Sequence, residues 1–157
     1  MFYEIKNVFY MKKVYLFLIL FMFTSFVASA KELRIDGTGT RKVTGITFSD
    51  GSSFRLFTSK GHWRASSGDY GMSDCHGTLK NNANEDVEFE VFCKMIDQDE
   101  ENFIMKFYRA KGSQSSGIGK AIIVDGSKKY AYLINIECNH AITYIKDDYF
   151  GIQKCKI

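Results

Sequence analysis

The densest group of side chains able to bind a ligand lies between residues 62 and 76. It consists of Trp63, Arg64, Tyr70 and His76. An indole followed by a guanidinium, a phenol and an imidazole is typical of a pocket for a small apolar or anionic ligand. The alternative is that Trp63 packs inside the fold while Arg64 lies in a solvated turn. Both interpretations stay open, and these four residues form the candidate ligand site.

No catalytic motif accompanies this candidate site. The Gly-x-Ser-x-Gly arrangement of a nucleophile elbow is absent from the sequence, and residues 117–120 (GIGK) lack the spacing of a phosphate-binding loop. The acidic stretch 97–101 offers oxygen ligands for calcium, but it lacks the glycine and the final glutamate of an EF-hand. A turn between two strands explains this stretch, and replacing Asp97 by Asn is then nearly silent. We therefore predict no catalytic residue, no bound metal and no cofactor.

Residues 1–30 are predicted to be a leader that contains a Sec-type signal peptide. Met11 is followed by two lysines, by an apolar stretch from Val14 to Phe23 and by the small-x-small site 28–30 (ASA). The apolar stretch is shorter than the roughly 20 residues that span a bilayer, which favours cleavage after Ala30 over a retained membrane anchor. We expect translation to start at Met11 and the mature protein to be periplasmic or secreted, with no stable membrane span.

The mature part, residues 31–157, is predicted to form a single disulfide-bonded domain with a core of its own. The whole chain carries a net charge of +3. Because the leader holds three lysines and one glutamate, the mature part keeps a net charge of only +1. A nearly neutral surface argues against electrostatic recognition of nucleic acid.

All four cysteines lie in the mature part, at positions 75, 93, 138 and 155. An even number of cysteines in an oxidising compartment predicts two disulfides. Three pairings are open to four cysteines, and we favour Cys75–Cys93 and Cys138–Cys155 because each pair brackets what looks like neighbouring strands. A zinc site is disfavoured, since no Cys-x-x-Cys or His-x-x-x-His spacing occurs.

The mature chain is punctuated by turns made from Gly, Asn, Asp and Ser, and it contains no proline. Asp50-Gly51 and Asp125-Gly126 are the strongest hairpin signals. Between the turns, apolar and polar residues alternate with a period of two, as in 87–95 and 103–107. This alternation predicts short antiparallel strands with one face in the core.

Two further stretches are expected to be strands. Residues 130–138 show the same alternation, and residues 121–124 (AIIV) form a continuous apolar run that is typical of a strand buried on both faces. Parity places His140 in the core or lumen. With no convincing amphipathic helix, the mature chain is predicted to be an all-β, mostly up-and-down antiparallel barrel of about eight strands, with a β-sandwich as the alternative.

Two segments resemble a pattern of small exported bacterial proteins. The first is Cys75-His76-Gly77 with residues 93–99 (CKMIDQD), in which a Cys-x-Gly is followed by a second cysteine and an Asp-x-Asp. The second, residues 117–120 with residues 126–133 (GSKKYAYL), is similar to a glycine-rich segment of the allene oxide cyclase and dirigent-like barrels. The resemblance covers residues 61–138 and implies an eight-stranded antiparallel barrel. No catalytic residue of either family can be placed on this sequence.

Two classes of function are compatible with such a protein. The favoured hypothesis is a non-enzymatic binding or interaction module, whose partner is a small apolar ligand, an envelope or secreted protein, or a second copy of the chain. The predicted inward side chains are large (Phe89, Phe103, Phe107 and Tyr130), which indicates a filled barrel. The alternative is an isomerase or cyclase acting on a small apolar substrate in the lumen, an analogy that rests on fold alone.

Overall fold

The computed structural model describes residues 31–82, 87–109 and 117–157. The predicted leader, with its start at Met11 and its cleavage site after Ala30, lies outside the described residues. In the described part of the chain, no helix is long and apolar enough to cross a bilayer.

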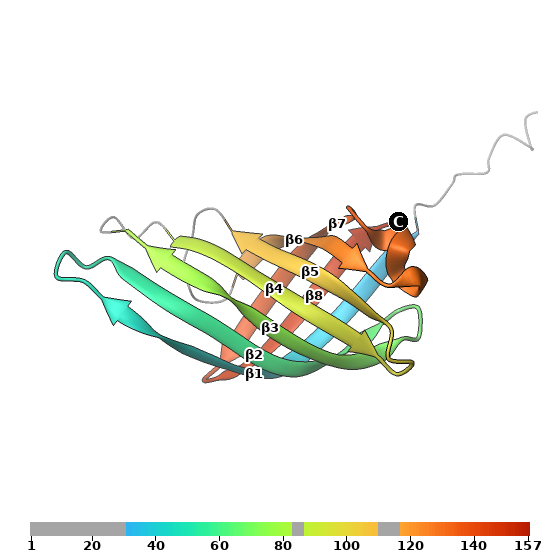
Figure 1. Ribbon diagram of the computed structural model, residues 1–157, viewed down its shortest axis with the longest axis horizontal. Coiled ribbons are helices and arrows are strands. Elements are labelled where there is room, and N and C mark those ends of the chain that lie inside the picture. The colour runs from blue at the N-terminus through green and yellow to red at the C-terminus, as the bar shows by residue number, and fades with distance from the viewer. Residues whose placement is uncertain (1–30, 83–86, 110–116) are drawn as a thin grey trace, which may run out of the picture. The chain divides into compact units, whose positions relative to one another are not determined.

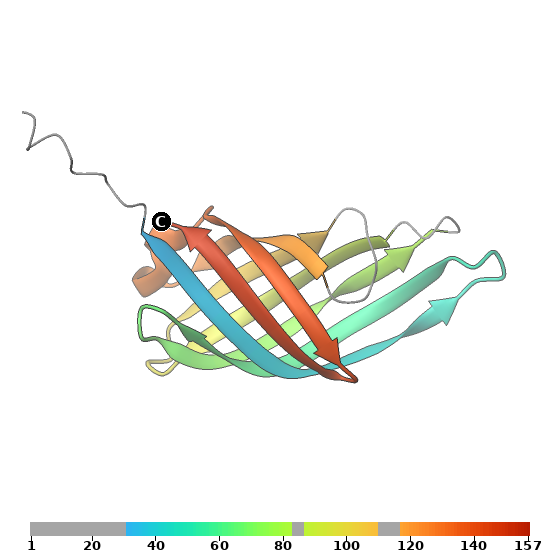
Figure 2. The ribbon, with the colours of Figure 1, turned by 180° about the vertical axis from the view of Figure 1, so that it is seen from behind.

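The described residues form eight antiparallel strands that close into a barrel in simple chain order, as predicted (Figures 1 and 2). The strands are β1 (Glu32–Thr47), β2 (Ser53–Ala65), β3 (Tyr70–Asn81), β4 (Val87–Asp97), β5 (Asn102–Arg109), β6 (Gly117–Gly126), β7 (Glu137–Ile145) and β8 (Asp148–Lys156). A 3₁₀ helix, η2 (Lys128–Leu133), connects β6 to β7. The β8–β1 ladder closes the barrel along Glu32–Thr40.

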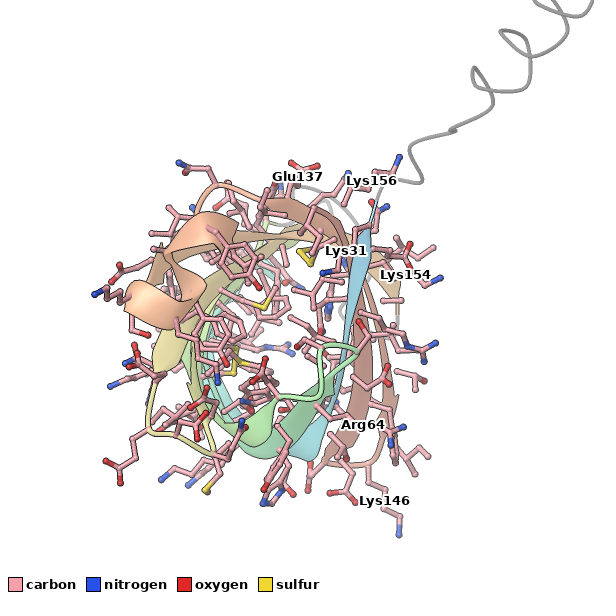
Figure 3. The ribbon with its side chains drawn as sticks, turned by 90° about the vertical axis from the view of Figure 1, so that its right-hand side faces the viewer. Lys31, Arg64, Glu137, Lys146, Lys154 and Lys156 are labelled. Carbon is pink, nitrogen blue, oxygen red and sulfur yellow. A yellow bond between two sulfur atoms is a disulfide. The ribbon has the colours of Figure 1, made fainter. Side chains whose placement is uncertain are left out.

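The two ends of the barrel differ. At one end, which we call the capped end, lie the start of β1, the end of β8, the β2–β3 and β4–β5 turns and η2 (Figures 1 and 3). At the other end, which we call the mouth, β1 runs on beyond β8 and forms a hairpin with β2, which stays paired with β3 as far as Asn81 (Figure 1). Gly51 at the tip of this hairpin has φ +85°, which confirms the predicted Asp50-Gly51 turn.

Because side chains alternate between the two faces of a strand, every second residue points into the barrel. In β4, Val91, Cys93 and Met95 are buried and the residues between them are exposed. Of the four aromatic residues predicted to point inward, three are buried: Phe103, Phe107 and Tyr130. The fourth, Phe89, is partly buried and packs against the core. The lumen is therefore largely filled by side chains, which is one of the two arrangements that an eight-stranded barrel allows.

Three sequence predictions for residues 121–138 are wrong. Residues 128–133 form η2 instead of a strand, because Tyr130 and Leu133 are three residues apart and both turn inward, which matches the three-residue repeat of a 3₁₀ helix. Asp125-Gly126 accordingly leads into η2 and not into a hairpin. In the run 121–124, Ala121 and Ile123 are fully buried, but Val124 is 38% exposed, so that strand buries one face only.

One close approach in the barrel wall requires glycine. Gly39 and Gly61 are directly opposite each other on β1 and β2. A Cβ atom at Gly61 would lie 2.6 Å from the Tyr149 hydroxyl oxygen and would also collide with the Thr38 carbonyl. The missing side chains therefore let the Tyr149 side chain extend from β8 over β1 toward β2, with its hydroxyl against the two glycines.

Candidate functional site

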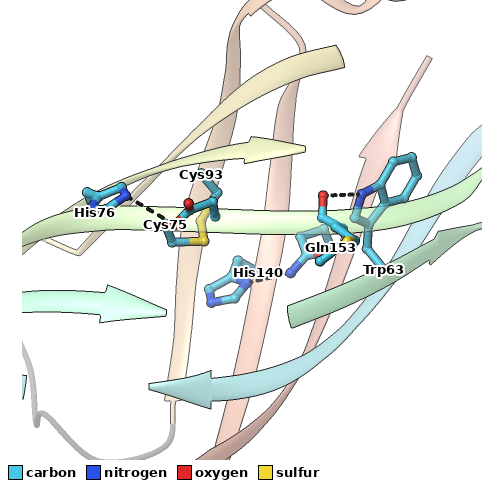
Figure 4. Close-up of a disulfide and its surroundings, with 8 residues drawn as sticks. Trp63, Cys75, His76, Cys93, His140 and Gln153 are labelled. Carbon is cyan, nitrogen blue, oxygen red and sulfur yellow. Dashed lines mark hydrogen bonds and ion pairs between the residues drawn. A yellow bond between two sulfur atoms is a disulfide. The ribbon is translucent and has the colours of Figure 1, made fainter. Parts of the chain in front are cut away.

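Both disulfides belong to the barrel wall, and the predicted pairing is confirmed. Cys75 is directly opposite Cys93 on β3 and β4, and Cys138 is directly opposite Cys155 on β7 and β8. All four side chains are buried, and Figure 4 shows the Cys75–Cys93 bridge. Two disulfides fit a protein of the extracellular space or the periplasm.

The polar centre of the lumen is a histidine held by a glutamine. His140 and Gln153 are buried, and the Gln153 amide donates a hydrogen bond of 3.1 Å to His140 Nδ1 (Figure 4). The Phe107 ring meets the imidazole edge-on, with 4.7 Å between ring centroids. Burial, and secondly the positive charge of Arg109, lower the pKa of His140 to about 4. His140 is therefore neutral at physiological pH, and Nε2 carries its proton.

The mouth of the lumen is basic. Arg41 on β1, Arg109 on β5 and Tyr144 on β7 line it together with apolar residues such as Phe57 and Ile142. We call Arg41, Arg109 and Tyr144 the basic mouth. Within the described residues, the lining of this mouth includes no carboxylate. Its two guanidiniums place two positive charges among the described residues that line the entrance of the lumen.

The two arginines are held in different ways. The Arg41 guanidinium carbon lies 3.8 Å above the centre of the Tyr144 ring, and Nη2 donates a 3.5 Å hydrogen bond to the Lys146 carbonyl. The Arg109 guanidinium lies along Gly117, where a Cβ atom would be only 3.0 Å from Nη2. Burial raises the pKa of Tyr144, an effect that the charges of Arg41 and Arg109 oppose.

The lumen offers little free space. A cavity of about 50 Å³ lies around His140 and Gln153, and one of about 20 Å³ lies at the basic mouth. Phe57, Phe89, His140 and Ile142 line both cavities, so the two are neighbours along the barrel axis. Sites for drug-sized ligands measure roughly 300–1,000 Å³. Only a small chemical group fits inside without movement of the side chains.

Larger hollows lie on the outside of the barrel. One of about 550 Å³ covers β3 to β6, and one of about 440 Å³ covers β1, β2 and β8. Each hollow contains an ion pair: Lys106 Nζ lies 2.6 Å from Glu90 in the first, and Arg34 Nε lies 2.8 Å from Asp36 in the second. Surface pairs of this kind leave little net charge for a ligand.

The structure does not gather the four predicted ligand residues into one place. Trp63 is buried at the capped end, where its Nε1 donates a 3.0 Å hydrogen bond to the Met72 carbonyl. The other three are exposed on the outside of the barrel (Figures 3 and 4). Ligand binding at Trp63, Arg64, Tyr70 and His76 stays a prediction, since no observation tests it.

The acidic stretch 97–101 is the predicted turn between β4 and β5, but its first residue is not solvated. The Asp97 side chain is 0% exposed, and Lys129 Nζ and the Tyr130 hydroxyl donate hydrogen bonds of 2.6 and 2.7 Å to it. The backbone N–H groups of Asp99 and Glu101 donate two more. The carboxylate thus connects η2 to the β4–β5 turn. The nearly silent Asp97→Asn substitution was expected for a solvated turn, and with this carboxylate buried we now expect the substitution to destabilise the fold.

Lys129 sits among three carboxylates at the capped end. Its Nζ lies 2.9 Å from Asp69, 2.6 Å from Asp97 and 2.9 Å from Asp99. The hydrogen bonds to these groups, that to Asp97 first, raise the pKa of Lys129. In the part of the chain that the structure describes, no cluster of three His, Cys, Asp or Glu side chains is arranged for a metal ion.

The residues of the basic mouth were missed at the sequence level, although a signal existed. Arg109 continues the inward parity of Phe103 and Phe107, and Tyr144 continues that of His140. A charged residue in the inward register at the end of a strand indicates a polar entrance to a lumen. The sequence prediction places the ligand site instead at Trp63, Arg64, Tyr70 and His76.

Comparison with known proteins supports the fold. An enzyme from Penicillium herquei superimposes with a TM-score of 0.61 at 14% identity, over 76% of this chain and 90% of that chain. A conserved protein of unknown function from Rhodopseudomonas palustris has a TM-score of 0.61 at 12% identity, over 82% of this chain and 99% of that chain. No protein-family model and no curated protein matches the chain. The molecule is therefore a small disulfide-bonded β-barrel with a filled lumen and a basic mouth.

Proposed function

We propose that this protein is an exported, non-enzymatic binding module that takes a small carboxylate with a short apolar body into the basic mouth. The observation that carries the proposal is the pair of guanidiniums, Arg41 and Arg109, which line the entrance of the lumen together with mainly apolar side chains. The two disulfides, which suit an oxidising compartment, support the exported location.

Charge selects the head group of the ligand. Arginine presents a planar fork of donors that matches a carboxylate, and a charge-assisted hydrogen bond is roughly twice as strong as a neutral one. Arg109 faces the cavity that leads to His140, and Arg41 is steadied by the Tyr144 ring. A carboxylate between the two guanidiniums would meet both donors from a half-buried position.

Space and polarity select the body of the ligand. Phe57, Phe89 and Ile142 line the way inward from the basic mouth. The two cavities of about 20 and 50 Å³ hold a short aliphatic chain at most. Each buried CH₂ group contributes about 0.8 kcal/mol, which is roughly a fourfold gain in affinity.

The test is a titration of the oxidised protein with acetate, propionate, butyrate and hexanoate, followed by calorimetry. We expect affinity to rise with each CH₂ group and to stop rising once the chain fills the cavity. Butyramide, which lacks the charge, binds at least roughly tenfold more weakly than butyrate. Equal affinity for all four acids, or for butyramide and butyrate, contradicts the proposal.

Variants locate the site. Arg41→Gln and Arg109→Gln each weaken butyrate binding by roughly tenfold or more, because each removes one charge-assisted contact. Arg64→Gln is the matched control, since Arg64 is an exposed arginine on the outside of the barrel. If Arg64→Gln weakens binding and the two mouth variants do not, the ligand binds outside the lumen.

A second candidate function is an isomerase or cyclase that acts on a small apolar substrate. The observation that favours it is the neutral His140, held by Gln153 beside the 50 Å³ cavity. The resemblance to allene oxide cyclase and dirigent-like barrels and the fold shared with a Penicillium herquei enzyme are compatible with it. Proton exchange at a bound substrate that disappears in His140→Gln supports this candidate, and an unchanged ligand recovered after incubation argues against it.

A further inference from the structure

The hairpin of β1 and β2 leaves one strand edge without a neighbour. The β8 strand pairs with β1 only as far as Thr40, and the last hydrogen bond on that side runs from the Arg41 N–H to the Asp147 carbonyl, at 2.8 Å. Residues 42–47 of β1 continue beyond this point and pair only with β2. Figure 1 shows this hairpin extending past the other strands.

The direction of the backbone groups along this edge follows from two hydrogen bonds. The Arg41 N–H points toward β8, and the Phe48 N–H points toward β2, where it donates to the Ser52 carbonyl. In an antiparallel ladder, successive residues alternate between the two sides of a strand. The N–H and C=O groups of Val43, Gly45 and Thr47 therefore face the open edge. Within the described residues, no strand pairs with them there.

We propose that a second copy of this chain pairs with this edge, antiparallel and about a twofold axis at Gly45. Exposed strand edges are templates for another strand, and an extended polypeptide is the partner that matches their alternating donors and acceptors. The twofold register places Val43 opposite Thr47 of the second copy and Gly45 opposite Gly45. In this register every edge-facing residue exchanges backbone hydrogen bonds, which makes the interface self-complementary.

Charge and side-chain chemistry favour this register. The antiparallel register puts Lys42 opposite Phe48 of the second copy. A parallel, in-register arrangement would instead put Lys42 opposite Lys42 of the second copy, and these like charges would repel each other. Val43, Thr44, Ile46 and Thr47 are β-branched residues, which suit a strand. The outer face of the hairpin also carries exposed apolar side chains: Ile46 (58%), Phe48 (51%), Phe54 (37%) and Leu56 (51%). The paired hairpins would join these side chains into one continuous apolar face.

The experiment uses a charge swap at the two positions that face each other in the proposed register. In Val43→Lys with Thr47→Lys, every such pair becomes lysine opposite lysine. In Val43→Glu with Thr47→Lys, every pair becomes glutamate opposite lysine. Sedimentation of the oxidised protein over a range of concentrations measures the dissociation constant of the dimer. Both variants change exposed positions, and their melting temperatures report whether the barrel itself stays intact.

The wild-type protein is expected to dimerise, the lysine variant to raise the dissociation constant by roughly tenfold or more, and the glutamate–lysine variant to restore dimerisation. A wild-type protein that stays monomeric at every concentration overturns the proposal. So does a dimer that the lysine variant leaves unchanged, because its interface then lies elsewhere. The outcome does not depend on the basic mouth, whose arginines stay in place in both variants.

Discussion

The Asp97→Asn substitution at the capped end removes one negative charge and almost no volume. The asparagine oxygen still accepts from the backbone N–H groups of Asp99 and Glu101, which now share Oδ1 of Asp97. The other carboxylate oxygen, which accepts from Lys129 and Tyr130, becomes an NH₂ group that can only donate. Two donors of η2 then face a third donor in a buried place.

The size of the effect follows from the pKa of Asp97. Burial alone raises this pKa, but the hydrogen bonds from Lys129, Tyr130 and the two backbone N–H groups outweigh burial and lower it from 3.8 to about 2. A difference of one pKa unit corresponds to 1.36 kcal/mol, so the folded state favours the charged form by about 2 kcal/mol. For a domain of this size, we expect Asp97→Asn to lower Tm by about 8 °C.

Thermal and denaturant unfolding of the oxidised protein near pH 7 measure this loss. Asp99→Asn is the matched control, because Asp99 also lies 2.9 Å from Lys129 Nζ but its side chain is 61% exposed. An exposed ion pair contributes about 0–1 kcal/mol, so Asp99→Asn is expected to change Tm by less than half as much. Equal losses in the two variants, or no loss in Asp97→Asn, would refute the reasoning.

Acid unfolding gives an independent check of the same carboxylate. Because the folded pKa lies below the ordinary value, the stabilisation is complete above about pH 5 and is lost as the pH falls toward 2. The Asp97→Asn variant lacks this group and should lose less stability than the wild type over that range. If the wild type and the variant lose the same unfolding free energy as the pH falls, Asp97 is not the source of this acid sensitivity.

Two more predictions concern the lumen. Replacing both cysteines of either disulfide by serine should lower the free energy of unfolding, measured with denaturant, by about 3 kcal/mol, because the bridges span 18 and 17 residues. A loss below about 1 kcal/mol would show that the bridges contribute little to stability. His140 has a folded pKa of about 4 against an ordinary 6.5, so the unfolded chain takes up its proton first and stability falls as the pH drops from 6.5 to 4. His140→Gln should flatten the stability profile in this window, and an unchanged slope would contradict the assignment.

The fold was predictable because its signals are local. Alternation in residues 87–95 and 103–107 indicated strands with one inward face, and the structure follows that parity to Met95 and Phe107. The cysteine pairing was also predictable, because Cys75 and Cys93 lie on β3 and β4, two strands that are consecutive in the chain and pair with each other. Neighbouring antiparallel strands bring such pairs together without any knowledge of the tertiary structure.

The functional features were harder to predict because they depend on contacts distant in sequence. Arg41 and Tyr144 are about a hundred residues apart, and only closure of the barrel brings them together. Asp97 looked like one of several acids in a turn, but its burial comes from Lys129 and Tyr130 on η2, a segment whose alternation imitates a strand. A period-two pattern cannot distinguish a short strand from a 3₁₀ turn with inward residues three apart.

The most direct test of the proposed ligand site is a titration of the oxidised protein with butyrate, followed by the side-chain Nε–H signals of its arginines in ¹H–¹⁵N NMR spectra. The account predicts saturable shifts of Arg41 and Arg109, which line the basic mouth, and constant signals for Arg34 and Arg64 on the outside of the barrel. Shifts confined to Arg34 and Arg64, or no saturable shift at all, would contradict a carboxylate site at the basic mouth.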